Sequence, residues 1–269
     1  MTSGKASKRR RREANAAPPP VRGQRGGRRA SPKVLLAAAA VIALVAVGAG
    51  LAIAFTGGGS SPSSSTPATG SLQNALPNAS EAQQLLHGIP QHGNVLGAEK
   101  APVTVVEYID LQCPACQQFE TQALPQLVPR YVRTGKVKLE ARPIAFIGPD
   151  SERGRAAALA AGAQDRMFNF MEILYFNQGV ENTGWLDERM INAAAASVRG
   201  LDVSALLSAR GSAAVTDQET AIDAQRTADK VNATPTFFVG KTGGKLHEVS
   251  VSSQTDIASL SAAIDDALR

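Results

Sequence analysis

Very few residues of this sequence could cross-link a fold or bind a metal. Its 269 residues include only two cysteines and three histidines. A zinc site usually needs about four cysteine, histidine or carboxylate ligands, and two cysteines without paired histidines do not supply them. We therefore expect no metal and no other cofactor. The histidines, His87, His92 and His247, are scattered, and none is expected to take part in catalysis.

Acidic residues are almost absent from the start of the chain. Residues 1–33 contain eleven lysines and arginines but a single acid, Glu13, which gives this segment a charge of +10. Since the whole chain has a net charge of +5, residues 34–269 must carry −5. The excess positive charge belongs to a short tail rather than to a folded domain, and we expect no binding to nucleic acid.

One long hydrophobic run, Val34–Phe55, follows the basic tail. It contains no charged residue, and as a helix it would span about 33 Å, enough for the core of a bilayer. Positive charge in front of such a segment places the N-terminal side in the cytoplasm. We therefore expect a cytoplasmic tail at residues 1–33, an uncleaved transmembrane signal anchor at residues 34–55, and the catalytic domain on the outer side of the cell membrane.

Two other interpretations of this segment remain open. Ala52-Ile53-Ala54 resembles the small-residue site at which a signal peptide is cleaved, although the run is longer than the usual signal core of about 7–15 residues. Arg28-Arg29 faintly resembles a twin-arginine signal, but the apolar residues that such a signal needs are missing. Neither pattern fits as well as an anchor.

The part of the chain beyond the hydrophobic run divides into a linker and one domain. Residues 56–81 begin with a stretch rich in glycine, serine, threonine and proline, which predicts a flexible linker. Residues 82–269 are long enough to bury an ordinary core without disulfide bonds. We therefore predict a single folded domain over these residues.

Both cysteines fall in one motif, Cys113-Pro114-Ala115-Cys116. An apolar run rich in β-branched residues leads into the motif, and a helix-like pattern follows it. A strand that leads into CxxC at the N-terminus of a helix is the thioredoxin-type redox arrangement. A disulfide between residues three apart closes too small a loop to stabilise a fold much. The pair therefore indicates chemistry rather than structural cross-linking.

The pattern of the domain predicts a split sheet with a helical insertion. Because a helix joins the first two strands, these strands should be parallel. The first helix should bend or break at Pro125 and Pro129, and the insertion should be interrupted at residues 179–184. Strands are expected at residues 103–111, 137–147, 236–239 and 246–251, and helices at residues 114–133, 151–230 and 255–268.

This order of elements resembles the thioredoxin fold with the insertion typical of DsbA. The chain as a whole is similar to the single-pass DsbA-like proteins of Gram-positive bacteria, especially actinobacteria. The resemblance implies an α/β domain with a helical insertion at about residues 150–230. It rests on four segments: the cysteine motif followed by Gln118-Phe119-Glu120, Glu107 six residues before the first cysteine, Thr234-Pro235-Thr236 before an apolar strand, and Phe168–Asn177 in the insertion.

Cys113 is the expected exposed nucleophile. The thiolate is the reactive form of cysteine, and the free N–H groups and dipole of a helix N-terminus lower its pKa. Pro114 suits the first helical turn, where its missing N–H costs nothing. Ala115 adds neither charge nor hydrogen bond, so we expect a less extreme pKa for Cys113, and a less oxidising pair, than a histidine there would give. Pro114 and Ala115 are also expected to border the substrate.

Cys116 is the expected resolving thiol, partly buried one turn into the helix. It needs a proton acceptor, and Glu107 shares a strand face with the apolar Val103 and Val105. A carboxyl group on an apolar face should have a raised pKa, which suits proton transfer. The alternative is a glutamate that faces solvent on a strand whose other face is buried. Asp110 on the opposite face argues against that alternative.

The loop before the third strand is the other expected part of the site. The family resemblance implies a cis peptide bond before Pro235, with the Thr234 backbone beside the cysteines, where an unfolded substrate can pair as an added strand. The alternative is a trans proline at the start of an edge strand. Trp185 and the Met/Phe-rich run of the insertion are expected to be core, with part of the run available to line a groove for peptide.

These residues predict an enzyme, a monomeric extracytoplasmic thiol–disulfide oxidoreductase that oxidises the cysteines of exported proteins. Its substrates would be reduced or unfolded exported proteins, and a membrane redox partner would recharge the pair. The same residues would serve an extracytoplasmic reductase or, less well without a dimerisation domain, an isomerase. A binding or chaperone module of thioredoxin fold with an idle CxxC is the remaining alternative.

Overall fold

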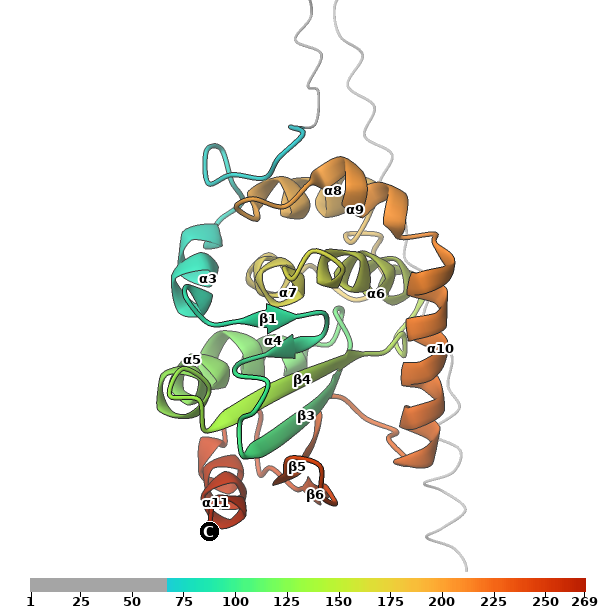
Figure 1. The fold of residues 1–269 in the computed structure, drawn as a ribbon. Helices are drawn as coiled ribbons and strands as arrows, with labels where there is room; N and C mark the ends of the chain where they lie inside the picture. Colours follow the sequence, from blue (N-terminus) through green and yellow to red (C-terminus); the bar gives the residue numbers. More distant parts are fainter. Residues whose placement is uncertain (1–66) are drawn as a thin grey trace, which may run out of the picture. The chain divides into compact units, whose positions relative to one another are not determined.

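The computed structural model describes residues 67–269 (Figure 1). The expected tail at residues 1–33 and the expected anchor at residues 34–55 lie outside the described residues. Among residues 67–269, no helix combines the length and the hydropathy that crossing a bilayer requires.

A six-stranded sheet forms the centre of the domain, in the order β1-β2-β4-β3-β5-β6. As predicted, β3 runs parallel to β4, while all other neighbouring pairs are antiparallel. The strands are β1 (Gln91–His92), β2 (Val95–Leu96), β3 (Val103–Ile109), β4 (Val137–Pro143), β5 (Thr236–Lys241) and β6 (His247–Val249).

The central strand β3 is buried along its whole length. Its run of valine, isoleucine and tyrosine is typical of a strand with both faces covered. Glu107 pairs in register with Ala141 of β4 and Phe237 of β5, so it sits in the middle of the sheet. The strand delivers the chain directly to the cysteine motif.

The helix that follows the motif runs on from Pro114 to Val132 without a break. It consists of α4 (Pro114–Gln118), a π-helical turn η1 (Phe119–Ala123), α5 (Leu124–Leu127) and a second π-helical turn η2 (Val128–Val132). The helix is therefore not broken at Pro125 or Pro129, contrary to one of the two expected outcomes. A proline removes one i→i−4 hydrogen bond, and the wider π turns accommodate that loss.

The predicted insertion is a group of five helices. In Figure 1, α8 and α9 lie over α6 and α7, and α10 runs beside them toward the sheet. The Met/Phe-rich run forms α7 and is core, as predicted, and the half-buried Trp185 packs against the same core. The helices are α6 (Pro149–Gly162), α7 (Met167–Phe176), α8 (Glu188–Ser197), α9 (Val203–Ala209) and α10 (Ala213–Ala228). The chain ends in α11 (Ile257–Ala267), which packs against β5.

The folded unit begins before the expected boundary at residue 82. Residues 67–81, expected to belong to a flexible linker, are instead packed on the insertion, and helix α3 (Ala79–Leu86) packs on α7. The Gly70 N–H donates to the Leu201 carbonyl at 2.8 Å. A β-carbon at this glycine would overlap the Val198 carbonyl, so no other residue fits this close approach. The flexible composition ends where these backbone hydrogen bonds begin.

Candidate active site

Cys113 is the N-cap of α4, in the turn that follows β3. Its backbone is extended, with φ −72° and ψ 119°, and Pro114 takes the first helical position as predicted. The Cys113 N–H donates to the Asp110 carbonyl at 2.9 Å, and its own carbonyl accepts from the Gln117 N–H at 3.0 Å. The side chain is only 7% exposed, so it is less open to solvent than expected.

The surroundings of Cys113 favour its thiolate. The pKa of Cys113 is lowered from an ordinary 9.0 to about 6, chiefly by a hydrogen bond from the Cys116 thiol. The Thr234 side chain and the N–H groups of Cys116 and Ala115 add to this effect, while burial opposes it. As a thiol, the sulfur also donates to the Thr234 carbonyl at 3.4 Å, which favours the protonated form. The donors outnumber this single acceptor, so we place the balance on the thiolate side.

The loop at Thr234 lies beside the cysteines, although 121 residues separate it from Cys113. The Thr234–Pro235 peptide bond is cis, as the family resemblance implies, and not the trans alternative. The strand that follows, β5, packs against the helix after the cysteine motif (Pro114–Val132, here called the redox helix). The rings of Phe119 and Phe237 lie with centroids 4.5 Å apart. The structure therefore brings together the two segments that the sequence predicted to form the site.

Cys116 has the opposite environment. It is 0% exposed, which is more complete than the expected partial burial. Its pKa is raised well above the ordinary value, first by burial and then by its hydrogen bond to Cys113 and the charge there. Both cysteines are free thiols in this structure. One sulfur is thus prepared to ionise and the other to stay protonated.

Glu107 is fully buried beneath the redox helix. Burial, followed by the charge of Glu120, raises its pKa well above the ordinary value, in the predicted direction. The reason given for its burial was wrong, however. Asp110 does not mark a solvent-facing side of the strand, since it is itself 0% exposed and both faces of β3 are covered.

Two further buried acids were missed. Glu120 from η1 and Glu172 from α7 are each 1% exposed, and both interact with the carboxyl group of Glu107 or with each other. Burial is the first cause that raises the pKa of both groups, to about 8 for Glu172. The sequence did carry signals. Glu120 follows Cys116 by four residues, and Glu172 is the one acid within the apolar run of α7.

A second missed feature is a set of polar side chains that fixes the loop before Cys113. The Tyr175 hydroxyl donates to the Asp110 carbonyl at 3.2 Å, and Gln178 Nε2 donates to the carbonyls of Leu111 at 2.9 Å and Cys113 at 3.3 Å. The insertion thereby holds the turn that positions the nucleophile.

The Asp110 carboxylate fixes the same turn from within. It accepts four hydrogen bonds of 2.7–3.0 Å, from the N–H groups of Gln112, Phe146 and Ile147 and from the Ser151 hydroxyl.

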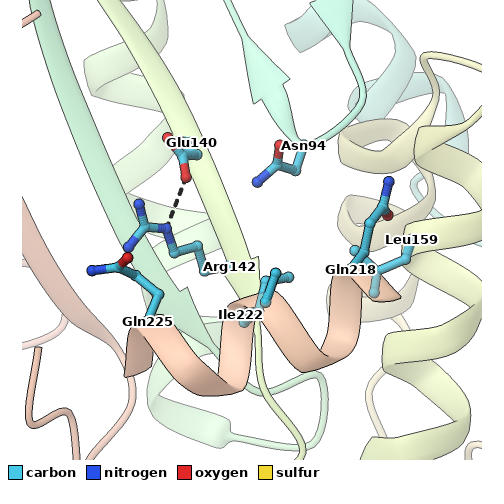
Figure 2. A pocket seen from close by; sticks show the side chains of 8 residues that line it. Asn94, Glu140, Arg142, Leu159, Gln218, Ile222 and Gln225 are labelled. Carbon is cyan, nitrogen blue, oxygen red and sulfur yellow. Dashed lines mark hydrogen bonds and ion pairs between the residues drawn. The ribbon is translucent and has the colours of Figure 1, made fainter. Parts of the chain in front are cut away.

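The pocket in Figure 2 lies between β4 and α10, and neither cysteine lines it. It has a volume of about 290 Å³. Arg142 at its wall is paired with Glu140 at 2.8 Å and with Asp229 at 3.2 Å. These contacts satisfy the charge of Arg142 within the protein, and the site residues lie elsewhere. Within residues 67–269, no three His, Cys, Asp or Glu side chains are grouped so as to hold a metal ion.

Comparison with known proteins agrees with this geometry. The family model described as Thioredoxin matches residues 91–266. The chain belongs to the thioredoxin family. It is 39% identical over 98 residues to the probable disulfide bond formation protein D of Bacillus cereus, a match that covers 36% of this chain and 45% of that protein. The disulfide bond formation protein D of Bacillus subtilis is 28% identical over 153 residues, with 54% and 66% covered.

A solved structure shows the same fold. The crystal structure of oxidised BdbD from Bacillus subtilis superposes with a TM-score of 0.57 at 23% identity, covering 67% of this chain and 97% of that one. The alignment with the Bacillus cereus protein spans a little less than half of that protein's length. Together the matches confirm that the chain belongs to the thioredoxin family and is similar to proteins named for disulfide bond formation.

Proposed function

We propose that this protein is an extracytoplasmic thiol–disulfide oxidoreductase that oxidises the cysteines of exported proteins. The observation that carries the proposal is the contrast within the motif. Cys113 lies at a helix N-cap with a pKa lowered to about 6, and Cys116 is buried one turn deeper with a raised pKa. A low pKa makes Cys113 a good leaving group when its mixed disulfide is broken. Cys113 is therefore the sulfur at which we expect exchange to take place.

The catalytic cycle begins with the Cys113–Cys116 disulfide. A substrate thiolate attacks the sulfur of Cys113, the disulfide breaks, and Cys116 leaves with the electron pair and takes up a proton. A second thiolate of the same substrate then attacks the substrate sulfur of the mixed disulfide, and Cys113 is released as a thiolate. The substrate loses two electrons and gains a disulfide, while the enzyme pair is reduced.

The remaining site residues take supporting roles in this cycle. Glu107 exchanges the proton of Cys116, because a buried carboxyl group with a raised pKa gives its proton as the acid and takes one up as the carboxylate. The backbone at Thr234 and Pro235 pairs with an extended substrate segment, and Pro114 and Ala115 border the substrate on the other side of Cys113. No cofactor is needed, since the electrons pass between sulfur atoms.

The proposed setting is the outer face of the cell membrane. Residues 34–55 would act as a single-pass anchor with the tail of residues 1–33 in the cytoplasm, and the enzyme would work as a monomer on reduced or unfolded exported proteins. A membrane redox partner would recharge the reduced pair. The uncharged apolar run at residues 34–55 and the basic tail before it support this setting.

The reduction potential of the full chain tests the direction of the reaction. The chain would be equilibrated with glutathione buffers and the ratio of disulfide to dithiol measured. A value between about −120 and about −180 mV supports disulfide donation. A value near about −270 mV, as in thioredoxin, would mean that the pair is better suited to reduction, and the oxidase proposal would be abandoned.

A second assay separates an enzyme from a binding module. The oxidised chain would be mixed with a reduced, unfolded ribonuclease, and free thiols counted over time. An oxidoreductase consumes the ribonuclease thiols, and the Cys113→Ser variant does not. A binding module of thioredoxin fold would leave the thiols intact and would retain its affinity for the unfolded chain in that variant.

A further inference from the structure

Buried polar atoms without a protein partner are concentrated in one place. Across residues 67–269, eleven buried side-chain nitrogen and oxygen atoms have no hydrogen-bond partner. Seven of them lie on only five residues: Glu107, Glu120, Glu172, Asn169 and Gln91. Such atoms are rare in native proteins, and a group of them marks a site where protons or water complete the hydrogen bonding.

Three of these residues form a carboxyl cluster, Glu107–Glu120–Glu172. Each comes from a different element, β3, η1 and α7, and each is at most 1% exposed. The three carboxyl groups all interact with one another, since Glu120 acts on both Glu107 and Glu172, and Glu107 acts on Glu172. Three carboxylates in one apolar pocket cannot all be charged, so the cluster holds protons and shares them between adjacent oxygens.

The buried cysteine and the cluster are linked by the redox helix, which carries both Cys116 and Glu120. Glu120 follows Cys116 by four residues in a continuous helix, so the two side chains lie on the same face one turn apart. Tyr175 of α7 senses the charges of Cys116, Glu120 and Glu107, and its pKa is raised well above the ordinary value, chiefly by burial. Cys116 is therefore buried on the face of the redox helix that also carries Glu120.

The groups that surround the cluster are few. Cys116 on the redox helix and Tyr175 on α7 face it, and Asp110 lies beyond Tyr175. Five carboxyl oxygens of Glu107, Glu120 and Glu172 are buried without a hydrogen-bond partner, and none of the ion pairs among residues 67–269 includes these three residues. Protons, and not a lysine or arginine, must therefore compensate the carboxyl charges.

A polar path continues from the cluster to the surface. Asn169 lies one turn before Glu172 on α7, and is 3% exposed. The Gln91 amide donates to Asn169 Oδ1 at 2.8 Å, which leaves Asn169 Nδ2 and Gln91 Oε1 unpartnered. Gln91 on β1 is only partly buried. The five residues thus lead from Cys116 to the edge of the sheet.

We propose that Glu172, supplied by the insertion, completes a proton relay from Cys116 through Glu120 and Glu107 toward Asn169 and Gln91. This inference rests on the proposed thiol–disulfide exchange and assigns it a proton path. When Cys116 leaves as a thiolate, the cluster gives it a proton and regains one through Glu172. When Cys116 attacks the Cys113 mixed disulfide, its S–H proton enters the cluster, the Cys113–Cys116 bond forms, and the departing thiolate takes its proton from solvent.

The test is the rate at which Cys116 resolves a mixed disulfide between Cys113 and glutathione in the full chain. Release of glutathione would be followed between pH 5 and pH 9 for the wild type and for Glu172→Gln, which keeps the shape but cannot ionise. We expect about tenfold slower release at neutral pH, less than the roughly 10²–10⁴-fold effect of a group in direct contact. The difference should vanish at high pH, where hydroxide removes the proton.

Glu152→Gln is the matched control, because Glu152 is an exposed acid of the same insertion, on α6. It should leave the pH profile of glutathione release unchanged. If Glu172 were only structural, Glu172→Gln would lower the stability but keep the wild-type pH profile, and the relay would be overturned. A wild-type chain that exchanges no disulfide would instead count against the proposed function.

A second measurement needs no variant. The infrared difference spectrum between the oxidised and the dithiol-reduced full chain reports the C=O stretch of protonated carboxyl groups. We expect this band to shift on reduction of the cysteine pair: the cluster regains the proton that it gives, but the new S–H group of Cys116 changes the hydrogen bonding of its carboxyl groups. A band that is identical in both redox states would overturn the relay, even if the Glu172→Gln variant fails to fold.

Discussion

Cys113 and Cys116 are separated by three positions of one helix but lie in opposite chemical surroundings. Cys113 receives hydrogen bonds from backbone and side-chain donors at the start of the helix, and its pKa falls to about 6. Cys116 lies one turn deeper, is completely buried, and has its pKa raised chiefly by that burial. A single helix turn therefore separates a sulfur that prefers to ionise from one that prefers its proton.

This difference teaches which part of the molecule controls each thiol. The donors around Cys113 come from the thioredoxin part of the chain, namely the helix start and the loop at Thr234. The surroundings of Cys116 include α7 of the insertion, which supplies Tyr175 and Glu172. In the proposed relay the insertion therefore does more than cover the sheet, since its Glu172 passes the proton of the second cysteine.

The largest expected effect comes from removing one sulfur at a time. For this test the substrate thiol is first converted to a disulfide with a small thiol that is a good leaving group. Cys113 of the Cys116→Ser variant should displace that small thiol, and the mixed disulfide between Cys113 and the substrate should accumulate. Cys113→Ser should form essentially none, because the remaining sulfur is 0% exposed. Gel separation under non-reducing conditions measures both. Equal trapping by the two variants would contradict the assignment of the nucleophile.

A second prediction concerns the pKa of Cys113. Ultraviolet absorbance of the thiolate in the reduced chain should rise with a midpoint near pH 6, the value to which the pKa is lowered. About nine-tenths of Cys113 would then be thiolate at pH 7, against a few per cent for an ordinary cysteine. The Cys113→Ser variant should lose this step. A midpoint near 9 would show that the Cys116 thiol and the N–H groups at the helix start do not act on the sulfur as described.

The sequence predicted the thioredoxin half of this comparison well. The strand before the motif, the helix after it, the parallel pairing of β3 and β4, and the cis peptide at Pro235 are all present. These features depend on local patterns or on motifs that a family resemblance can carry. Glu107 was also identified, because an acid among valines stands out on a single strand.

The sequence did not predict how distant elements meet. Glu107, Glu120 and Glu172 come from three elements, and no local pattern indicates that they share one pocket. The orientation of Asp110 was misjudged because alternation along a strand cannot show that both faces are covered. Residues 67–81 were expected to be flexible because their composition resembles a linker, whereas long-range hydrogen bonds to the insertion order them.

A third prediction turns the burial of the cluster into a pH dependence of stability. Glu172 has a pKa raised from 4.5 to about 8, so between these values the folded chain binds more protons than the unfolded chain. The stabilising contribution is fully present below about pH 4.5 and is lost as the pH rises through about 8. Unfolding of the oxidised chain by urea should show this loss, which amounts to a few kcal/mol since each pKa unit corresponds to about 1.4 kcal/mol.

The Glu172→Gln variant sharpens this third prediction. Glutamine does not ionise, so the variant should lose less stability than the wild type between pH 5 and pH 8. The oxidised form is used because its cysteines cannot titrate. A wild-type chain whose free energy of unfolding is constant over this range would mean that the carboxyl cluster is open to water.

The smallest expected effect comes from placing a charge between the two sulfurs. Ala115 contributes only its N–H to Cys113, so Ala115→His should add an imidazolium beside the thiolate at low pH. We expect the pKa of Cys113 to fall by about one unit, at the low end of the effect of a nearby opposite charge. The disulfide should become correspondingly easier to reduce, because a more stable thiolate favours the reduced pair.

Ala115→Gln controls for side-chain size, and an equal fall in the pKa of Cys113 in that variant would show that charge is not the cause. If Ala115→His instead shifted the titration of Cys116 as strongly as that of Cys113, the two sulfurs would share one environment, and the contrast between them would be lost.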